Sequence, residues 1–172
     1  MRILINAGHG GKDCGAIGQT GLKEAHVNLN VAKLVQKYLT HRNINSIVLQ
    51  QTNSLNEVID FTNKGLFDIG ISIHCNASEN KTANGVEVLY YPTSKCGKEM
   101  AKCVQDELVK KTGLRDRGIK ERRDLGFLRK TKCPCILVEC AFISNREEEQ
   151  MLKNDYSLFA QGIVRGLDKW LA

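Results

Sequence analysis

The segment RILINAGHGGKDCGAIGQTGLKEA, residues 2–25, shows the plan of the fold in three steps. Residues 2–7 are apolar enough to form a short buried strand. The stretch that follows holds six of the fifteen glycines, at positions 8, 10, 11, 15, 18 and 21, which is typical of a long loop with a demanding backbone. Apolar residues at helical spacing then predict an amphipathic helix over residues 23–40. We expect the loop between strand and helix to carry a functional site.

The rest of the chain continues this alternation of strands and helices. Strands are predicted at residues 44–49, 68–74, 86–91, 125–128 and 135–138, and helices at residues 55–64, 98–111 and 156–171. Ser144 and Glu147 have the spacing of a capping box, which predicts another helix start. Such alternation is typical of an α/β fold, with a mostly parallel mixed sheet and helices on both faces. Because no repeat or linker interrupts it, we expect one domain over residues 1–172.

The composition narrows the class of protein. A chain of 172 residues with 42% hydrophobic residues can bury one core without a structural metal, so any metal is expected to be catalytic. A net charge of +6 suits an anionic partner such as a bacterial wall, a membrane surface or nucleic acid. The most basic stretch, residues 115–132, contains one aromatic residue, Phe127, which disfavours a nucleic-acid platform. With neither a signal peptide nor an apolar run of about 20 residues, we expect synthesis in the cytoplasm and no membrane insertion.

Seven cysteines, an odd number, exclude a complete set of intramolecular disulfides. Cys75 adjoins His74 and Cys140 adjoins a glutamate, so a cysteine hydrolase is one alternative function. Neighbouring residues on a strand point to opposite faces, so we expect both thiols in the core. Cys133 and Cys135 flank a proline, and we expect them to pack in a strand, because no second cysteine pair has zinc-finger spacing.

Polar residues lie at the ends of three predicted strands. His9 follows the first strand, His74 closes the third, and Glu139 comes directly after residues 135–138. Ends of parallel strands share one crevice, which Glu24 at the start of the first helix can approach through the glycine loop. Two imidazoles and a carboxylate are typical of a catalytic zinc site, and a further acidic group would move protons. We therefore expect His9, Glu24 and His74 to bind zinc and Glu139 to act as general base and acid, although the spacing matches no short zinc signature.

Five longer motifs carry a family resemblance. In order, NAGHGGKDCGAIGQTGLKE, SIHCNA, GVEVLYY, RGIK and LVECAFISNREEE resemble the zinc-dependent N-acetylmuramoyl-L-alanine amidases of the amidase 3 type, over essentially the whole chain. The resemblance implies a mixed sheet of about six strands, one zinc ion, and cleavage of peptidoglycan between muramic acid and L-alanine. It also implies zinc ligands at His9, Glu24 and His74 and a catalytic Glu139. The family usually carries arginines where this chain reads VLQQTNSLN and EVIDFTNKG, and we expect their loss to affect local structure more than reaction type.

Substrate contacts are predicted less directly. Asn76 shares the strand face of His74 if the strand continues, so it either touches the stem peptide or caps the turn. The basic stretch 117–120, with Lys120, either meets wall carboxylates or forms a solvated loop. A wall-binding module without hydrolysis is a further alternative, which the intact Glu139 disfavours. We expect action outside the cell on the bacterial wall, and a phage-type endolysin, a host autolysin and a fragment without its wall-binding module all fit.

Overall fold

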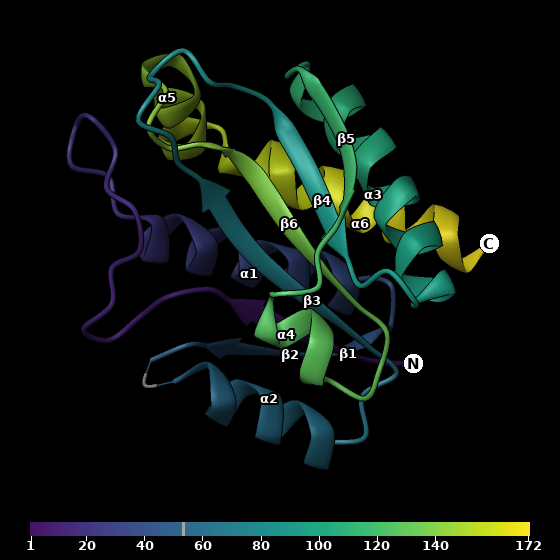
Figure 1. Ribbon diagram of the computed structural model, residues 1–172. Helices are drawn as coiled ribbons and strands as arrows, with labels where there is room; N and C mark the ends of the chain where they lie inside the picture. Colours follow the sequence, from purple (N-terminus) through teal and green to yellow (C-terminus); the bar gives the residue numbers. More distant parts are fainter. Residues whose placement is uncertain (53) are drawn as a thin grey trace.

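A mixed sheet forms the centre of the fold in the computed structural model, which describes residues 1–52 and 54–172. Its strand order is β2-β1-β3-β6-β4-β5 (Figure 1). Strands β1, β2, β3 and β6 are parallel, whereas β4 and β5, parallel to each other, run antiparallel to β6. This confirms the predicted mixed, mostly parallel sheet. The strand bounds are β1 Arg2–Ala7, β2 Asn45–Gln50, β3 Ile69–Asn76, β4 Val86–Tyr90, β5 Asp116–Glu121 and β6 Cys135–Phe142.

Helices cover the two faces of the sheet unequally (Figure 1). Helices α1, α3 and α6 pack on one face and enclose the main core, and the shorter α2 and α4 pack on the other, which we call the α2/α4 face. The helix bounds are α1 Glu24–Thr40, α2 Leu55–Lys64, α3 Lys95–Thr112, α4 Gly126–Lys130, α5 Arg146–Asn154 and α6 Tyr156–Leu171. None of these helices is long and apolar enough to cross a membrane.

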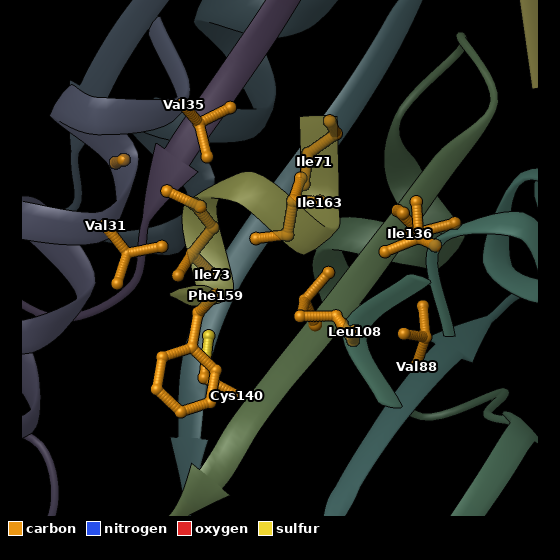
Figure 2. Packing of buried hydrophobic residues seen from close by; sticks show 14 of the residues in the cluster. Val31, Val35, Ile71, Ile73, Val88, Leu108, Ile136, Cys140, Phe159 and Ile163 are labelled. Carbon is orange, nitrogen blue, oxygen red and sulfur yellow. The ribbon is translucent and has the colours of Figure 1, made fainter. Parts of the chain in front are cut away.

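Helices α1, α3 and α6 supply most of the helical side chains of the main core, which they join to four strands. Figure 2 shows side chains of α1, α3 and α6 against those of β3, β4 and β6: Val31, Val35, Leu108, Phe159, Ile163, Ile71, Ile73, Val88, Ile136 and Cys140. Because successive side chains on a strand alternate in direction, the residues between these face the other side. On β3 and β6 this rule turns His74 and Glu139 to the α2/α4 face, where they are direct cross-strand partners.

Two elements differ from the sequence predictions. The strand predicted at residues 125–128 is wrong, because this segment belongs to α4, where Phe127 and Leu128 are both buried in the smaller core. A strand would have turned these two neighbours to opposite faces. Strand β5 was not predicted, since DRGIKE offers only Ile119 as an apolar residue and lies at the edge of the sheet.

The helix starts also differ in detail. Helix α3 begins earlier than predicted, because Ser94 caps it by accepting a hydrogen bond from the backbone N–H of Gly97. The cap of α5 is Asn145, whose side chain accepts hydrogen bonds from two backbone N–H groups. Ser144 is therefore not the predicted cap, and its buried hydroxyl instead accepts a hydrogen bond from Ser78 N at 2.9 Å.

Candidate metal centre

Three predicted ligands meet at the carboxyl ends of β1 and β3. His9 lies in the glycine loop, residues 8–22, Glu24 is the first residue of α1, and His74 lies on β3. Oε1 of Glu24 lies 3.4 Å from Nε2 of His9 and 3.1 Å from Nδ1 of His74. One ligand atom of each residue lies within 4.8 Å of the others. The structure thus brings together all three side chains predicted to bind zinc.

The backbone of the glycine loop approaches these side chains closely. A Cβ on Gly8 would lie 2.1 Å from Cε1 of His74, and a Cβ on Gly15 would lie 2.6 Å from Oε2 of Glu24. His9 itself has a φ of 60°, a left-handed conformation that a non-glycine residue adopts only when its surroundings enforce it. The glycines therefore make room for the ligand side chains.

Helix α5 fastens the far part of the glycine loop (Figure 1). Glu149 is fully buried and accepts hydrogen bonds from the backbone N–H of Thr20 at 2.9 Å and from its hydroxyl at 2.8 Å. Gln19 donates a hydrogen bond to the carbonyl of Ser144 at 2.8 Å. Because α5 follows β6 directly, the loop is tied to the same part of the sheet that carries Glu139.

Other polar groups orient the ligands. Nδ1 of His9 lies 2.8 Å from Oδ2 of Asp13, which leaves Nε2 facing Glu24. Oε2 of Glu24 accepts a hydrogen bond from Ala16 N at 2.9 Å, and Oε1 accepts one from Cys75 N at 3.1 Å. Asp13 was not predicted from the sequence, although its position four residues after a candidate ligand is a usable signal.

The environment keeps Glu24 anionic. Burial alone would raise the pKa of its carboxyl group, but the hydrogen bond and charge of His74 and two backbone N–H groups outweigh burial, and the pKa is lowered. Asn28, fully buried one turn along α1, donates hydrogen bonds to Gly8 O at 2.9 Å and to Oε1 of Glu24 at 3.4 Å. An anionic carboxylate is the form that binds a cation.

The donor set fits a tetrahedral zinc ion. Bonds of about 2.0–2.1 Å from such an ion place two of its donor atoms roughly 3.4 Å apart. The two separations measured from Oε1 of Glu24, 3.4 Å and 3.1 Å, are close to this value. Two imidazole nitrogens and one carboxylate leave a fourth position open, as catalytic zinc sites require. Among the residues described, no other cluster of three such side chains could hold an ion.

Glu139 lies beside this cluster without joining it. It pairs with His74 across β3 and β6, and the strand continues to Phe142 instead of ending there as predicted. Its Oε2 is shielded from solvent and has no hydrogen-bond partner in the part of the chain that the structure describes. Burial and the nearby charges of Glu24 and Glu87 raise the pKa of Glu139 to about 8. A buried carboxyl group without a partner is typical of a reactive position.

The two predicted substrate contacts lie in different places. Asn76 is on β3, where its Nδ2 donates to Oε1 of Glu87 at 2.9 Å and its Oδ1 accepts from Ala77 N at 2.9 Å. Lys120 is exposed on β5, which β4 and β6 separate from β3. Residues 117–120 are thus part of a strand and do not form a loop. Glu87, which the sequence analysis did not single out, joins Asn76 to the neighbouring strand.

The thiols beside the motifs lie in the main core, as predicted. Cys75 and Cys140 are buried, and burial raises the pKa of both thiols well above the ordinary value. They therefore stay protonated and out of contact with solvent. Cys135 is buried in β6 as expected, whereas Cys133 precedes the strand, so the prediction that it packs in a strand is wrong; the two Sγ atoms lie 3.8 Å apart. This arrangement disfavours the cysteine hydrolase.

Known proteins resemble this chain over nearly its whole length. The family described as N-acetylmuramoyl-L-alanine amidase matches residues 3–169. The amidase LytC of Bacillus subtilis is 35% identical over 88% of this chain, which covers 31% of LytC. The endolysin of Bacillus phage SPP1 is 34% identical over 96% of this chain, which covers 64% of the endolysin.

A solved structure agrees with both the fold and the sequence. The crystal structure of an N-acetylmuramoyl-L-alanine amidase from Clostridium difficile 630 has a TM-score of 0.92 and 35% identity, covering 99% of this chain and 96% of that one. Sequence match, fold and the clustering of the motif residues agree. The chain belongs to the N-acetylmuramoyl-L-alanine amidase family.

Proposed function

We propose that this chain is a catalytic domain, spanning residues 1–172, that hydrolyses the amide bond between N-acetylmuramic acid and L-alanine in bacterial peptidoglycan. The observation that carries the proposal is the position of Glu139, whose buried, unpartnered carboxyl oxygen lies next to a cluster of three metal-binding side chains. Family membership supports the same reaction. The chain spans less than two thirds of LytC and of the phage endolysin, so the activity is proposed for this domain itself.

We propose zinc as the metal, held by His9, Glu24 and His74. When bound, zinc would act as a Lewis acid that polarises the amide carbonyl and lowers the pKa of water, so that hydroxide is available at neutral pH. The anionic Glu24 supplies the negative charge of the donor set. Asp13 holds the ring of His9 with Nε2 toward the centre.

Glu139 moves the proton in this proposal. It takes a proton from the attacking water and delivers it to the nitrogen of L-alanine, so that the amine leaves neutral and the carboxyl group returns to its starting state. A pKa near 8 in the metal-free protein suits both steps, because a group whose pKa lies close to the working pH both accepts and donates protons well. Burial of Oε2 keeps bulk water from competing for that proton.

The direct test is release of free L-alanine amino groups from purified peptidoglycan, with and without a chelator, followed by addition of zinc. The proposal predicts release that stops with the chelator and returns with zinc, with no new reducing sugar ends. Release that ignores the chelator would point to a cysteine hydrolase, and no release from several wall types would point to a wall-binding role. The substrate places the action of this domain outside the cell, on the wall.

A further inference from the structure

Four side chains form a row across the α2/α4 face. His74 on β3 pairs with Glu139 on β6, and Glu139 pairs with Glu87 on β4. Directly opposed residues on neighbouring strands point to the same side of a sheet. Glu87 in turn binds Arg117 on β5, with 2.8 Å between Nε and Oε2. The row leads from the metal-binding cluster to the edge of the sheet.

A bulge in β5 lies opposite Glu87 and includes Arg117. Val86 pairs with Asp116 but Val88 pairs with Ile119, so both Arg117 and Gly118 lie opposite Glu87. Gly118 has a φ of 75°, the left-handed conformation that such a bulge demands of glycine. Asp116 and Ile119 are three residues apart, so strict alternation would turn them to opposite faces of the sheet. The bulge lets them pair with Val86 and Val88, which share one face.

A second bulge supplies a floor for the guanidinium of Arg117. His74 pairs with Glu139 but Asn76 pairs with Phe142, so β6 has one residue more than β3 between these pairs. Phe142 consequently shares the face of Asn76. The guanidinium carbon of Arg117 lies 4.8 Å from the centroid of the Phe142 ring. Stacking on a buried ring fixes the plane of the guanidinium and lowers the entropy lost when it binds a ligand.

Glu87 leaves one edge of the guanidinium available. The ion pair uses Nε, and Nη1 of Arg117 lies 3.5 Å from the carbonyl oxygen of Asn84. That distance lies beyond the usual range for an N–H···O hydrogen bond. The end formed by Nη1 and Nη2 can therefore receive two oxygens of one carboxylate. The side chain of Arg117 is 30% exposed, so solvent and a ligand can reach part of it.

A second cation lies near the same position. Arg122 is close enough for its charge to act on both Glu87 and Glu139, although Asp124 also binds it through two nitrogens, at 2.8 Å and 2.7 Å. Two carboxyl groups, Glu87 and the buried Glu148, lie close enough to Arg117 for their charges to interact with it. The pre-oriented donor pair of Arg117 and the nearby charge of Arg122 attract an incoming carboxylate against these two acids.

We infer that Arg117, positioned by Glu87 and Phe142, binds the α-carboxylate of the stem-peptide residue that follows L-alanine. The inference rests on the proposed amidase function. Phe142 lies on the strand next to β3, and neighbouring strands are about 4.8 Å apart. Successive Cα atoms of a peptide are about 3.8 Å apart, so we place the second residue of a peptide whose first residue lies at the cluster over this neighbouring strand, on the side of the guanidinium. Walls that carry an amide in place of this carboxylate would lose the charged half of the contact.

The test compares two substrates that differ only at this group, muramyl-L-alanyl-D-isoglutamate and muramyl-L-alanyl-D-isoglutamine. The wild type should hydrolyse the carboxylate form with the higher kcat/KM. Arg117→Gln should lower kcat/KM for the carboxylate form by about 10- to 100-fold, the effect of one charge-assisted hydrogen-bonded pair, and change the amide form far less. Arg117→Lys keeps the charge but loses the fork and should fall between. Arg123→Gln, at an exposed position outside the row, is the matched control.

Two outcomes would overturn the inference, and a binding measurement separates it from the proposed function. If Arg117→Gln lowers kcat/KM for both substrates equally, Arg117 only maintains structure. If the wild type shows no preference, the carboxylate is not recognised. Titration of the dipeptides L-alanyl-D-isoglutamate and L-alanyl-D-isoglutamine into the zinc-loaded protein reads the same preference without turnover. Selective binding that Arg117→Gln removes supports the subsite even where hydrolysis fails, and equal binding of both dipeptides contradicts it.

Discussion

Oδ2 of Asp13 lies 2.8 Å from Nδ1 of His9, and the opposite ring nitrogen faces Glu24. A carboxylate in this position fixes the ring orientation and raises the basicity of the ligating nitrogen. We expect Asp13→Ala to weaken zinc binding by about 10- to 100-fold. Competition with a chromophoric chelator measures the affinity. Asp60→Ala, at an exposed position on α2, is the control, and equal affinities for both variants would exclude an orienting role for Asp13.

Glu139→Gln should separate metal binding from catalysis. The side chain is not among the three clustered donors, so zinc stoichiometry should stay at one per chain. An amide cannot accept the proton of water, and we expect amide hydrolysis to fall by at least about 100-fold. Zinc content by elemental analysis and release of L-alanine amino groups are measured on the same preparation. Retained hydrolysis would remove Glu139 from the mechanism.

The same variant should change how stability depends on pH in the metal-free protein. The pKa of Glu139 rises from 4.5 to about 8 in the folded chain, so between these values the folded state binds more protons than the unfolded state. The contribution of Glu139 to the free energy of unfolding is therefore present at low pH and is lost as the pH rises toward 8. Because glutamine does not titrate, the Tm of Glu139→Gln minus that of the wild type should grow over this range. A constant difference would show that Glu139 has an ordinary pKa.

Gly8→Ala should destroy the metal centre. The new methyl group would lie 2.1 Å from Cε1 of His74, so the ring or the loop must move. A displacement of about 1 Å costs on the order of 100-fold in activity, and zinc affinity should fall with it. Gly21→Ala is the control, because it has a positive φ in the same loop but no atom within 4 Å of the new methyl group. If Gly8→Ala binds zinc as tightly as Gly21→Ala, the close approach has no functional role.

Cysteine chemistry should make no contribution to turnover. Cys75 is buried, and burial raises the pKa of its thiol, so a thiolate is not available at neutral pH. We expect Cys75→Ala to keep kcat within a few-fold of wild type and to lose about 1 kcal/mol of stability from the smaller side chain. Treatment of the wild type with iodoacetamide should leave activity intact. Inactivation that Cys75→Ala prevents would restore the cysteine hydrolase as a reading.

Periodicity predicted those parts of the fold that are apolar on at least one side. The predicted bounds of β1 and α2 match the structure, because β1 is a continuous apolar run and the apolar positions of α2 have helical spacing. Strand β5 lies at the sheet edge, where few side chains are buried, and no period marks it. The segment around Phe127 has two adjacent apolar residues, which strand and short helix explain equally well until packing decides.

The metal cluster was predictable and its surroundings were not. His9, Glu24 and His74 stand beside strands and a helix start whose order fixes their meeting point. Glu87 and Arg117 look like ordinary surface charges in sequence. They meet at a bulge between β4 and β5, and composition does not show where a strand carries an extra residue.

The bulge in β6 lies between Glu139 and Phe142. It therefore separates the residue proposed for catalysis from the residue proposed to position Arg117 for substrate selection. If β6 alternated strictly from Glu139 onward, Phe142, three residues later, would turn to the opposite face and away from Arg117, while Glu139 would still face His74. An insertion before Glu139 would carry the proton-moving carboxyl group into the main core. A change of strand register on the Phe142 side of the bulge can thus alter which walls are cut. The same change on the Glu139 side would abolish catalysis.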